Sequence, residues 1–107
     1  MPQRYVLSAE AVRDLFELQA FLSEREGEER ALTIIARLHR MMTALSEYPG
    51  MGRQRGNLQS SPYSHPVQSW MIFYRPTTDR TAIEIVRIID GRRDLGALLG
   101  RSPETTP

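Results

Sequence analysis

Apolar residues in the first half of the chain recur with the period of an α-helix, in two successive series. The first series has the spacing i, i+4, i+7, i+11 and comprises Ala11, Leu15, Leu18 and Leu22; the second repeats it in Ile34, Leu38, Met41 and Leu45. Such a stripe is the buried face of an amphipathic helix, and Val12 and Phe16 widen the first one. Ser8 is a favourable N-cap and Gly27 separates the two series. The pattern predicts an antiparallel helical hairpin that ends at Pro49.

The second half of the chain contains shorter apolar runs with the length of β-strands. Residues 70–74 form a continuous run and residues 83–89 a nearly continuous one, which predicts two central strands. A short strand is expected at residues 3–7, and another at residues 63–67, where Pro66 limits the ladder. The order β-α-α-β-β-β predicts an α+β fold in which the hairpin packs on a small antiparallel sheet.

The length of 107 residues is sufficient for one hydrophobic core. We expect a single domain over residues 1–100, with a helical turn at residues 92–99 and a disordered tail at residues 101–107. The chain has no apolar run of eighteen residues and no signal-peptide pattern, so we expect neither a membrane span nor export. The absence of cysteine fits the reducing cytosol, which is the expected compartment.

Metal and nucleotide sites are not expected in this chain. The two histidines, His39 and His65, are far apart, and cysteine is absent. His39 is interpreted as a partly buried structural imidazole, with a catalytic base as the alternative. The acids between the two helices (Glu24, Glu26, Glu28 and Glu29) are interpreted as a solvated helix corner, with a cation site as the alternative. No Gly-rich phosphate loop follows a strand, so no cofactor is expected.

Residues 49–107 carry 8 arginines against 5 acids, whereas residues 1–48 carry 6 arginines against 8 acids, so the second half of the chain is the basic one. All 14 basic residues are arginine. Arginine binds phosphate and carboxylate through a rigid fork but does not easily act as a base. We expect an anion-binding patch at one sheet edge, formed by Arg53, Arg55, Arg75, Arg87, Arg92 and Arg93. The alternative is that these side chains form ordinary ion pairs. An arginine within an apolar strand, such as Arg87, needs a partner in either case.

Several segments together carry a family resemblance: Tyr5-Val6-Leu7-Ser8, Tyr48-Pro49-Gly50-Met51-Gly52-Arg53, Met71-Ile72-Phe73-Tyr74-Arg75, Ile85-Val86-Arg87-Ile88 and Gly91-Arg92-Arg93-Asp94-Leu95. Over roughly residues 4–99 the chain resembles a ParE-type toxin of the RelE/ParE superfamily. The resemblance implies the strand, two-helix, three-strand fold. It also implies the toxin half of a type II toxin-antitoxin pair, in a hetero-oligomer with a ParD-like antitoxin that folds on the toxin surface.

The resemblance implies DNA gyrase as the target, bound without catalysis through Arg87, Arg92 and Arg93. No small-molecule substrate is implied. Because a wrapping antitoxin needs an apolar surface, the candidate antitoxin contacts are apolar helix positions: Leu18, Leu22, Leu38 and Met42. Core packing against the sheet is the alternative explanation of these positions.

The RelE branch of the superfamily provides a second hypothesis, a ribosome-dependent mRNA endoribonuclease. In that case the arginines would hold a phosphate, and Tyr74, His65 or Glu84 would exchange protons. A third alternative is a module that binds an antitoxin but is not toxic. It rests on Asp90, which stands where many ParE-like sequences have histidine.

Overall fold

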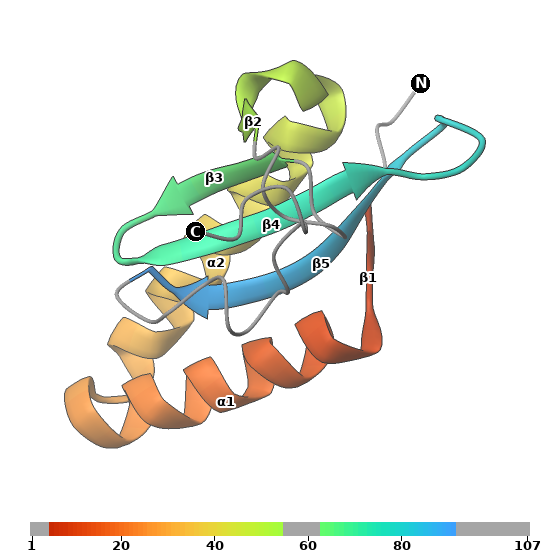
Figure 1. Ribbon diagram of the computed structural model, residues 1–107. Coiled ribbons are helices and arrows are strands. Elements are labelled where there is room, and N and C mark those ends of the chain that lie inside the picture. Colours follow the sequence, from red (N-terminus) through yellow and green to blue (C-terminus); the bar gives the residue numbers. More distant parts are fainter. Residues whose placement is uncertain (1–4, 55–62, 92–107) are drawn as a thin grey trace, which may run out of the picture.

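The computed structural model describes residues 5–54 and 63–91 (Figure 1). The elements in chain order are β1 (Tyr5–Leu7), α1 (Ala9–Glu26), α2 (Glu28–Glu47), the 3₁₀ turn η1 (Pro49–Met51), β2 (Arg53–Gln54), β3 (Tyr63–Val67), β4 (Trp70–Pro76) and β5 (Ile83–Asp90). The predicted order of strands and helices is confirmed, with β2 as an additional two-residue strand. The predicted helical turn at residues 92–99 and the predicted tail lie outside the described residues.

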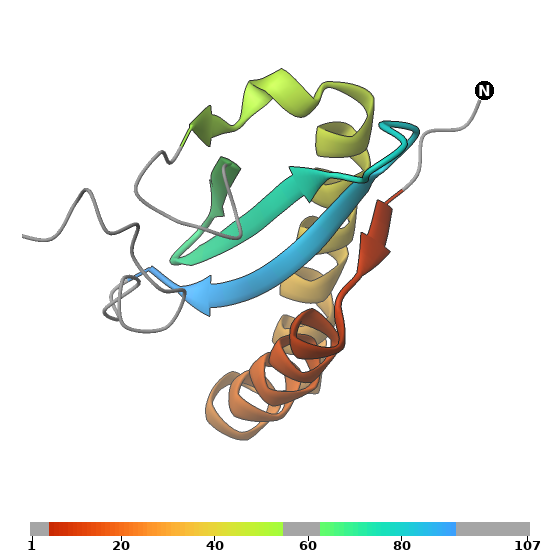
Figure 2. The same cartoon turned by 45° about the vertical axis from the view of Figure 1, so that its right-hand side comes forward.

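The strands form one sheet in the order β1-β5-β4-β3-β2. The sheet is mixed rather than purely antiparallel, because β1 pairs parallel to β5 while the other neighbours are antiparallel. The reason is the connection: β1 continues directly into the helical hairpin, and a long crossover of this kind permits parallel pairing. Figures 1 and 2 show α2 behind the sheet and α1 running beside β5.

The start of α1 is fixed by the predicted N-cap. The Ser8 hydroxyl accepts a hydrogen bond from the backbone N–H of Ala11 at 3.0 Å and donates one to the carbonyl of Val86 at 2.7 Å. Gly27 has φ +95°, a conformation that favours glycine, and it separates α1 from α2 without any longer loop. No described helix is both long enough and apolar enough to cross a bilayer.

The main core lies between the hairpin and one face of the sheet. It contains Leu22 from α1, Leu38 from α2 and alternate residues of the central strands, such as Ile72 and Ile85. On β4 the neighbouring Phe73, which points to the opposite face, is also 0% exposed. Burial on both faces explains why residues 70–74 form a continuous apolar run instead of an alternating one.

Tyr74 fixes the turn that follows α2. Its hydroxyl donates to the carbonyl of Pro49 at 2.6 Å and accepts from the N–H of Gly52 at 2.9 Å. Its ring stacks on that of Tyr63 with the centroids 5.5 Å apart. A side chain at Gly52 would overlap the Tyr74 hydroxyl, so only glycine allows this close approach.

Replacing Tyr74 with phenylalanine is expected to destabilise the protein by about 1–2 kcal/mol, because two partly buried backbone groups lose their partner. Burial raises the pKa of Tyr74 above its usual value of 10.0. The stability that this group contributes is therefore complete below pH 10 and is lost as the pH rises through the folded-state pKa. Urea denaturation between pH 8 and pH 11 should show a shallower alkaline decline for Tyr74→Phe than for the wild type. The exposed Tyr48, replaced in the same way, is the control; an equal effect of the two substitutions would contradict the assignment.

Candidate functional site

Arg87 on β5 forms a two-pronged ion pair with Asp14 on α1. The Nε–Oδ2 distance is 2.8 Å and the Nη2–Oδ1 distance is 3.0 Å, and Oδ2 also accepts the backbone N–H of Ile88 at 2.9 Å. The hydrogen bonds to Asp14 raise the pKa of Arg87. Asp14 thus covers the free edge of β5 beyond the point where β1 ends. Arg87 thus has the partner that an arginine in an apolar strand needs, and this partner belongs to the same chain.

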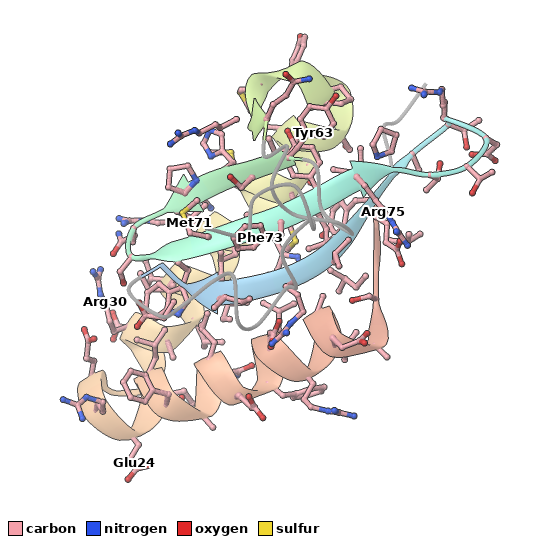
Figure 3. All side chains as sticks on the ribbon, in the orientation of Figure 1. Glu24, Arg30, Tyr63, Met71, Phe73 and Arg75 are labelled. Carbon is pink, nitrogen blue, oxygen red and sulfur yellow. The ribbon has the colours of Figure 1, made fainter. Side chains whose placement is uncertain are left out.

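The other described arginines of the predicted patch lie apart from Arg87. The exposed Arg75, near the end of β4, pairs with the half-buried Glu84 at 2.9 Å (Figure 3). Arg53 lies on the opposite edge strand, and Arg53 and Arg87 are separated by β3 and β4, roughly 14 Å at the usual strand spacing. Arg55, Arg92 and Arg93 lie outside the described residues. Among the residues described, the expected convergence on one sheet edge is therefore not found.

The four predicted antitoxin contacts are core residues. The exposed fractions are 6% for Leu18, 1% for Leu22 and 0% for both Leu38 and Met42. Core packing, the alternative that the sequence left open, is what the structure shows for these positions. A partner of the folded chain would have to use other apolar side chains.

Such side chains are exposed along the outer side of the helical hairpin. A cavity of 260 Å³ lies between α1 and α2; we call it the hairpin groove, and its walls are Leu7, Val12, Leu15, Phe16, Gln19, Ile35 and His39. Phe16 is 71% exposed and Val12 is 38% exposed. The sequence placed both in the buried stripe, and this expectation was wrong. Leu32, 51% exposed, lies one turn before Ile35 on the same side of α2.

His39 forms one end of the hairpin groove. The residue is exposed, whereas the sequence predicted a partly buried imidazole. Its structural role rests on a hydrogen bond, because Nδ1 lies 2.8 Å from the hydroxyl of Tyr5. This contact ties α2 to β1 beside the groove.

The acidic corner between the helices is exposed, as predicted (Figure 3). Glu26 and Arg30 form a loose pair with 3.7 Å between Oε1 and Nε. Residues 5–54 and 63–91 contain no group of three or more side chains that could hold a metal ion.

The three residues proposed for proton exchange do not meet at one point. The hydroxyl of Tyr74 already makes two hydrogen bonds, and burial raises its pKa. Glu84 pairs with Arg75 on the opposite face of the sheet from Tyr74, because Tyr74 is opposite Ile85 in the β4–β5 register. The Nδ1 atom of His65 lies 2.9 Å from the carbonyl of Pro66 on its own strand. Within the described residues, each of the three side chains therefore bonds to another group, and no hydrogen-bonded acid-base pair is formed between them.

Comparisons with known proteins agree on one family. The family model described as "ParE toxin of type II toxin-antitoxin system, parDE" matches residues 5–95. The chain is 31% identical over 88 residues to Toxin ParE3 of Caulobacter vibrioides, covering 82% of this chain and 86% of the relative. A solved structure described as "Chromosomal ParDE TA system from P. aeruginosa" shares the fold, with a TM-score of 0.69 and 16% identity over 83% of this chain and 96% of that one. The protein belongs to the ParE toxin family of type II toxin-antitoxin systems.

Proposed function

We propose that this toxin arrests growth by binding DNA gyrase and that a ParD-like antitoxin neutralises it by docking in the hairpin groove. The observation that supports the second part is the exposed apolar surface around Phe16, which the fold itself does not use. The family, in which toxin and antitoxin are paired, supports the identity of the partner. The cytoplasm is the compartment in which the toxin would encounter both DNA gyrase and the antitoxin.

The hairpin groove fits an amphipathic helix of a partner. Its side chains come from two adjacent helices and from β1, so an apolar face with contacts at i, i+3 or i+4, and i+7 can lie along it. An antitoxin segment that is disordered when free would order on this surface and bury Phe16 and Val12. The product is a toxin-antitoxin hetero-oligomer.

Binding to gyrase, rather than catalysis, is favoured by the separation of Tyr74, His65 and Glu84. Two arginines of the sequence hypothesis, Arg87 and Arg75, already pair with carboxylates. Arg53 is exposed. Arg92 and Arg93 are the proposed contacts with the target. Their guanidinium groups would bind an acidic surface or DNA phosphate through charge-assisted hydrogen bonds.

Induction of the toxin without its antitoxin is expected to stop growth and to cause gyrase-linked DNA breaks. Purified toxin should inhibit supercoiling by gyrase in vitro. The double substitution Arg92→Gln with Arg93→Gln is expected to weaken inhibition about tenfold, roughly the value of one charge-assisted hydrogen bond. Arg80→Gln, in the exposed turn between β4 and β5, is the matched control and should leave inhibition unchanged.

Three results would contradict the gyrase proposal. Undiminished supercoiling at saturating toxin would remove gyrase as the target. Cleavage of messages on translating ribosomes would establish the RelE-type alternative. Normal growth on induction, with the folded toxin present in the cell, would favour the binding module without toxicity.

A further inference from the structure

Two arginines on α2 have no acidic partner in the described part of the chain. Arg37 and Arg40 are exposed, and neither makes an ion pair or a side-chain hydrogen bond within residues 5–54 and 63–91. The other positions three and four residues away from them on α2 hold no acid; they are Thr33, Ile34, Ala36, Met41, Thr43 and Ala44. Arg37 and Arg40 are themselves three residues apart, so their charges lie on one face of the helix and repel each other. An anion bound between them would relieve this repulsion.

The two arginines border a cavity of 400 Å³ that we call the arginine cleft. Its other walls are Met41 of α2 and the segment Pro66, Val67 and Gln68 at the end of β3. Met41 is half-buried and Val67 is 8% exposed, so the floor is apolar while the rim is cationic. A nucleic-acid backbone would leave the apolar floor without a partner. A protein segment with a carboxylate next to an apolar side chain satisfies both parts.

A third hollow on α2 adjoins both the arginine cleft and the hairpin groove. It is lined by His39, Arg40, Thr43, Ala44 and Glu47, and it shares His39 with the groove and Arg40 with the cleft. The three hollows form one track around α2, from the apolar surface at Phe16 to the end of β3. Glu47 is the acid on this track. It lies two helical turns beyond Arg40, so a partner carboxylate is favoured at the arginine end.

We propose that the antitoxin segment continues past the hairpin groove around α2 and places an acidic side chain, with an apolar neighbour, in the arginine cleft. Arg37 and Arg40 hold the carboxylate through their guanidinium forks. This inference rests on the proposed function, because it takes the antitoxin as the occupant. Once the apolar contact is made, the second contact is intramolecular, which raises the overall affinity well above that of the groove alone.

The test uses the full chain and its ParD-like antitoxin, which are co-expressed, isolated as a complex and then separated. Arg37→Gln with Arg40→Gln is expected to weaken the complex about 10–100-fold at low salt, roughly the value of one charge-assisted hydrogen bond. The loss should shrink at high salt, because these contacts are exposed and screened. Arg37→Lys with Arg40→Lys keeps the charge without the fork and should show a smaller loss. Arg80→Gln is the control for an exposed arginine elsewhere, and thermal melting checks that each variant is folded.

The outcomes separate this inference from the proposed function. If Phe16→Glu weakens the complex and the Arg37/Arg40 double variant does not, the cleft has no role and the groove proposal stands. If neither variant changes the affinity, both proposals fail. If the double variant loses affinity for a DNA duplex and keeps its affinity for the antitoxin, the cleft belongs to nucleic acid and the inference is overturned. Restoration of binding to Arg37→Glu by an acid-to-arginine substitution in the antitoxin segment would establish the direct contact.

Discussion

Replacing Asp14 with alanine is expected to destabilise the toxin by about 3–5 kcal/mol, the usual cost of removing one partner from a largely buried ion pair. The Asp14 side chain is 10% exposed and that of Arg87 is 22% exposed. The substitution leaves the guanidinium and the backbone N–H of Ile88 without their acceptor. The Asp14 carboxylate pairs with the charge of Arg87 and also accepts a hydrogen bond from the free edge of β5. Its loss therefore affects the packing of α1 on the sheet.

Urea denaturation followed by circular dichroism measures this loss in the free energy of unfolding. At the usual relation between free energy and melting temperature for a chain of this size, the melting temperature should fall by more than about 10 °C. The matched control is Glu84→Ala, which removes the carboxylate of the exposed Arg75–Glu84 pair. Exposed pairs contribute little, so this control should cost less than about 1 kcal/mol. Similar losses for the two variants would contradict the structural role assigned to Asp14.

Replacing Phe16 with glutamate is expected to weaken antitoxin binding at least about 100-fold, as removal of an aromatic anchor from the centre of an interface does. The new carboxylate would also have to be desolvated in an apolar groove. The stability of the free toxin should change little, since Phe16 is already 71% exposed. In cells, the variant should stop growth even when the antitoxin is co-expressed.

Phe21→Glu is the matched control for the groove. Phe21 is also on α1 and is 50% exposed, but it lies on the other side of the helix, beside Asp14 and Trp70. The guanidinium of Arg25 lies over the Phe21 ring, 5.2 Å from its centroid. This substitution should change antitoxin affinity less than about threefold, in keeping with a position outside the interface. Equal losses for Phe16→Glu and Phe21→Glu would show that charge on α1, and not the groove, decides binding.

Helical periodicity predicted the hairpin well but did not predict its exposed side. Ala11, Leu18 and Leu22 were placed on the buried face of α1 and are buried. At about 100° per residue, Phe16 lies about 160° around the helix from Leu18, too far to face the same sheet. The apolar stripe of α1 is therefore wider than the one face that packs on the sheet, and this extra width is the sequence feature that indicated an interaction surface. It was interpreted as additional core.

The arginine hypothesis shows a different limit of sequence reasoning. The apolar surroundings of Arg87 indicated that it needed a partner, but the partner, Asp14, is 73 residues away along the chain. Local spacing contains no information on such a contact. The charges of Arg37 and Arg40, which are unpaired within the described residues, were missed for the same reason, because the cleft that they border exists only where Pro66 and Val67 approach α2.

The sequence alone determined the order of the elements, the capping at Ser8 and Gly27, and most of the core, because these depend on periodicity and on local backbone chemistry. Tertiary structure alone decided the parallel pairing of β1 with β5, the pairing of Arg87 with Asp14, and the exposure of Phe16. Each of these results depends on which surfaces meet when distant segments fold together, and that choice is made by packing and desolvation over the whole chain rather than by neighbouring residues.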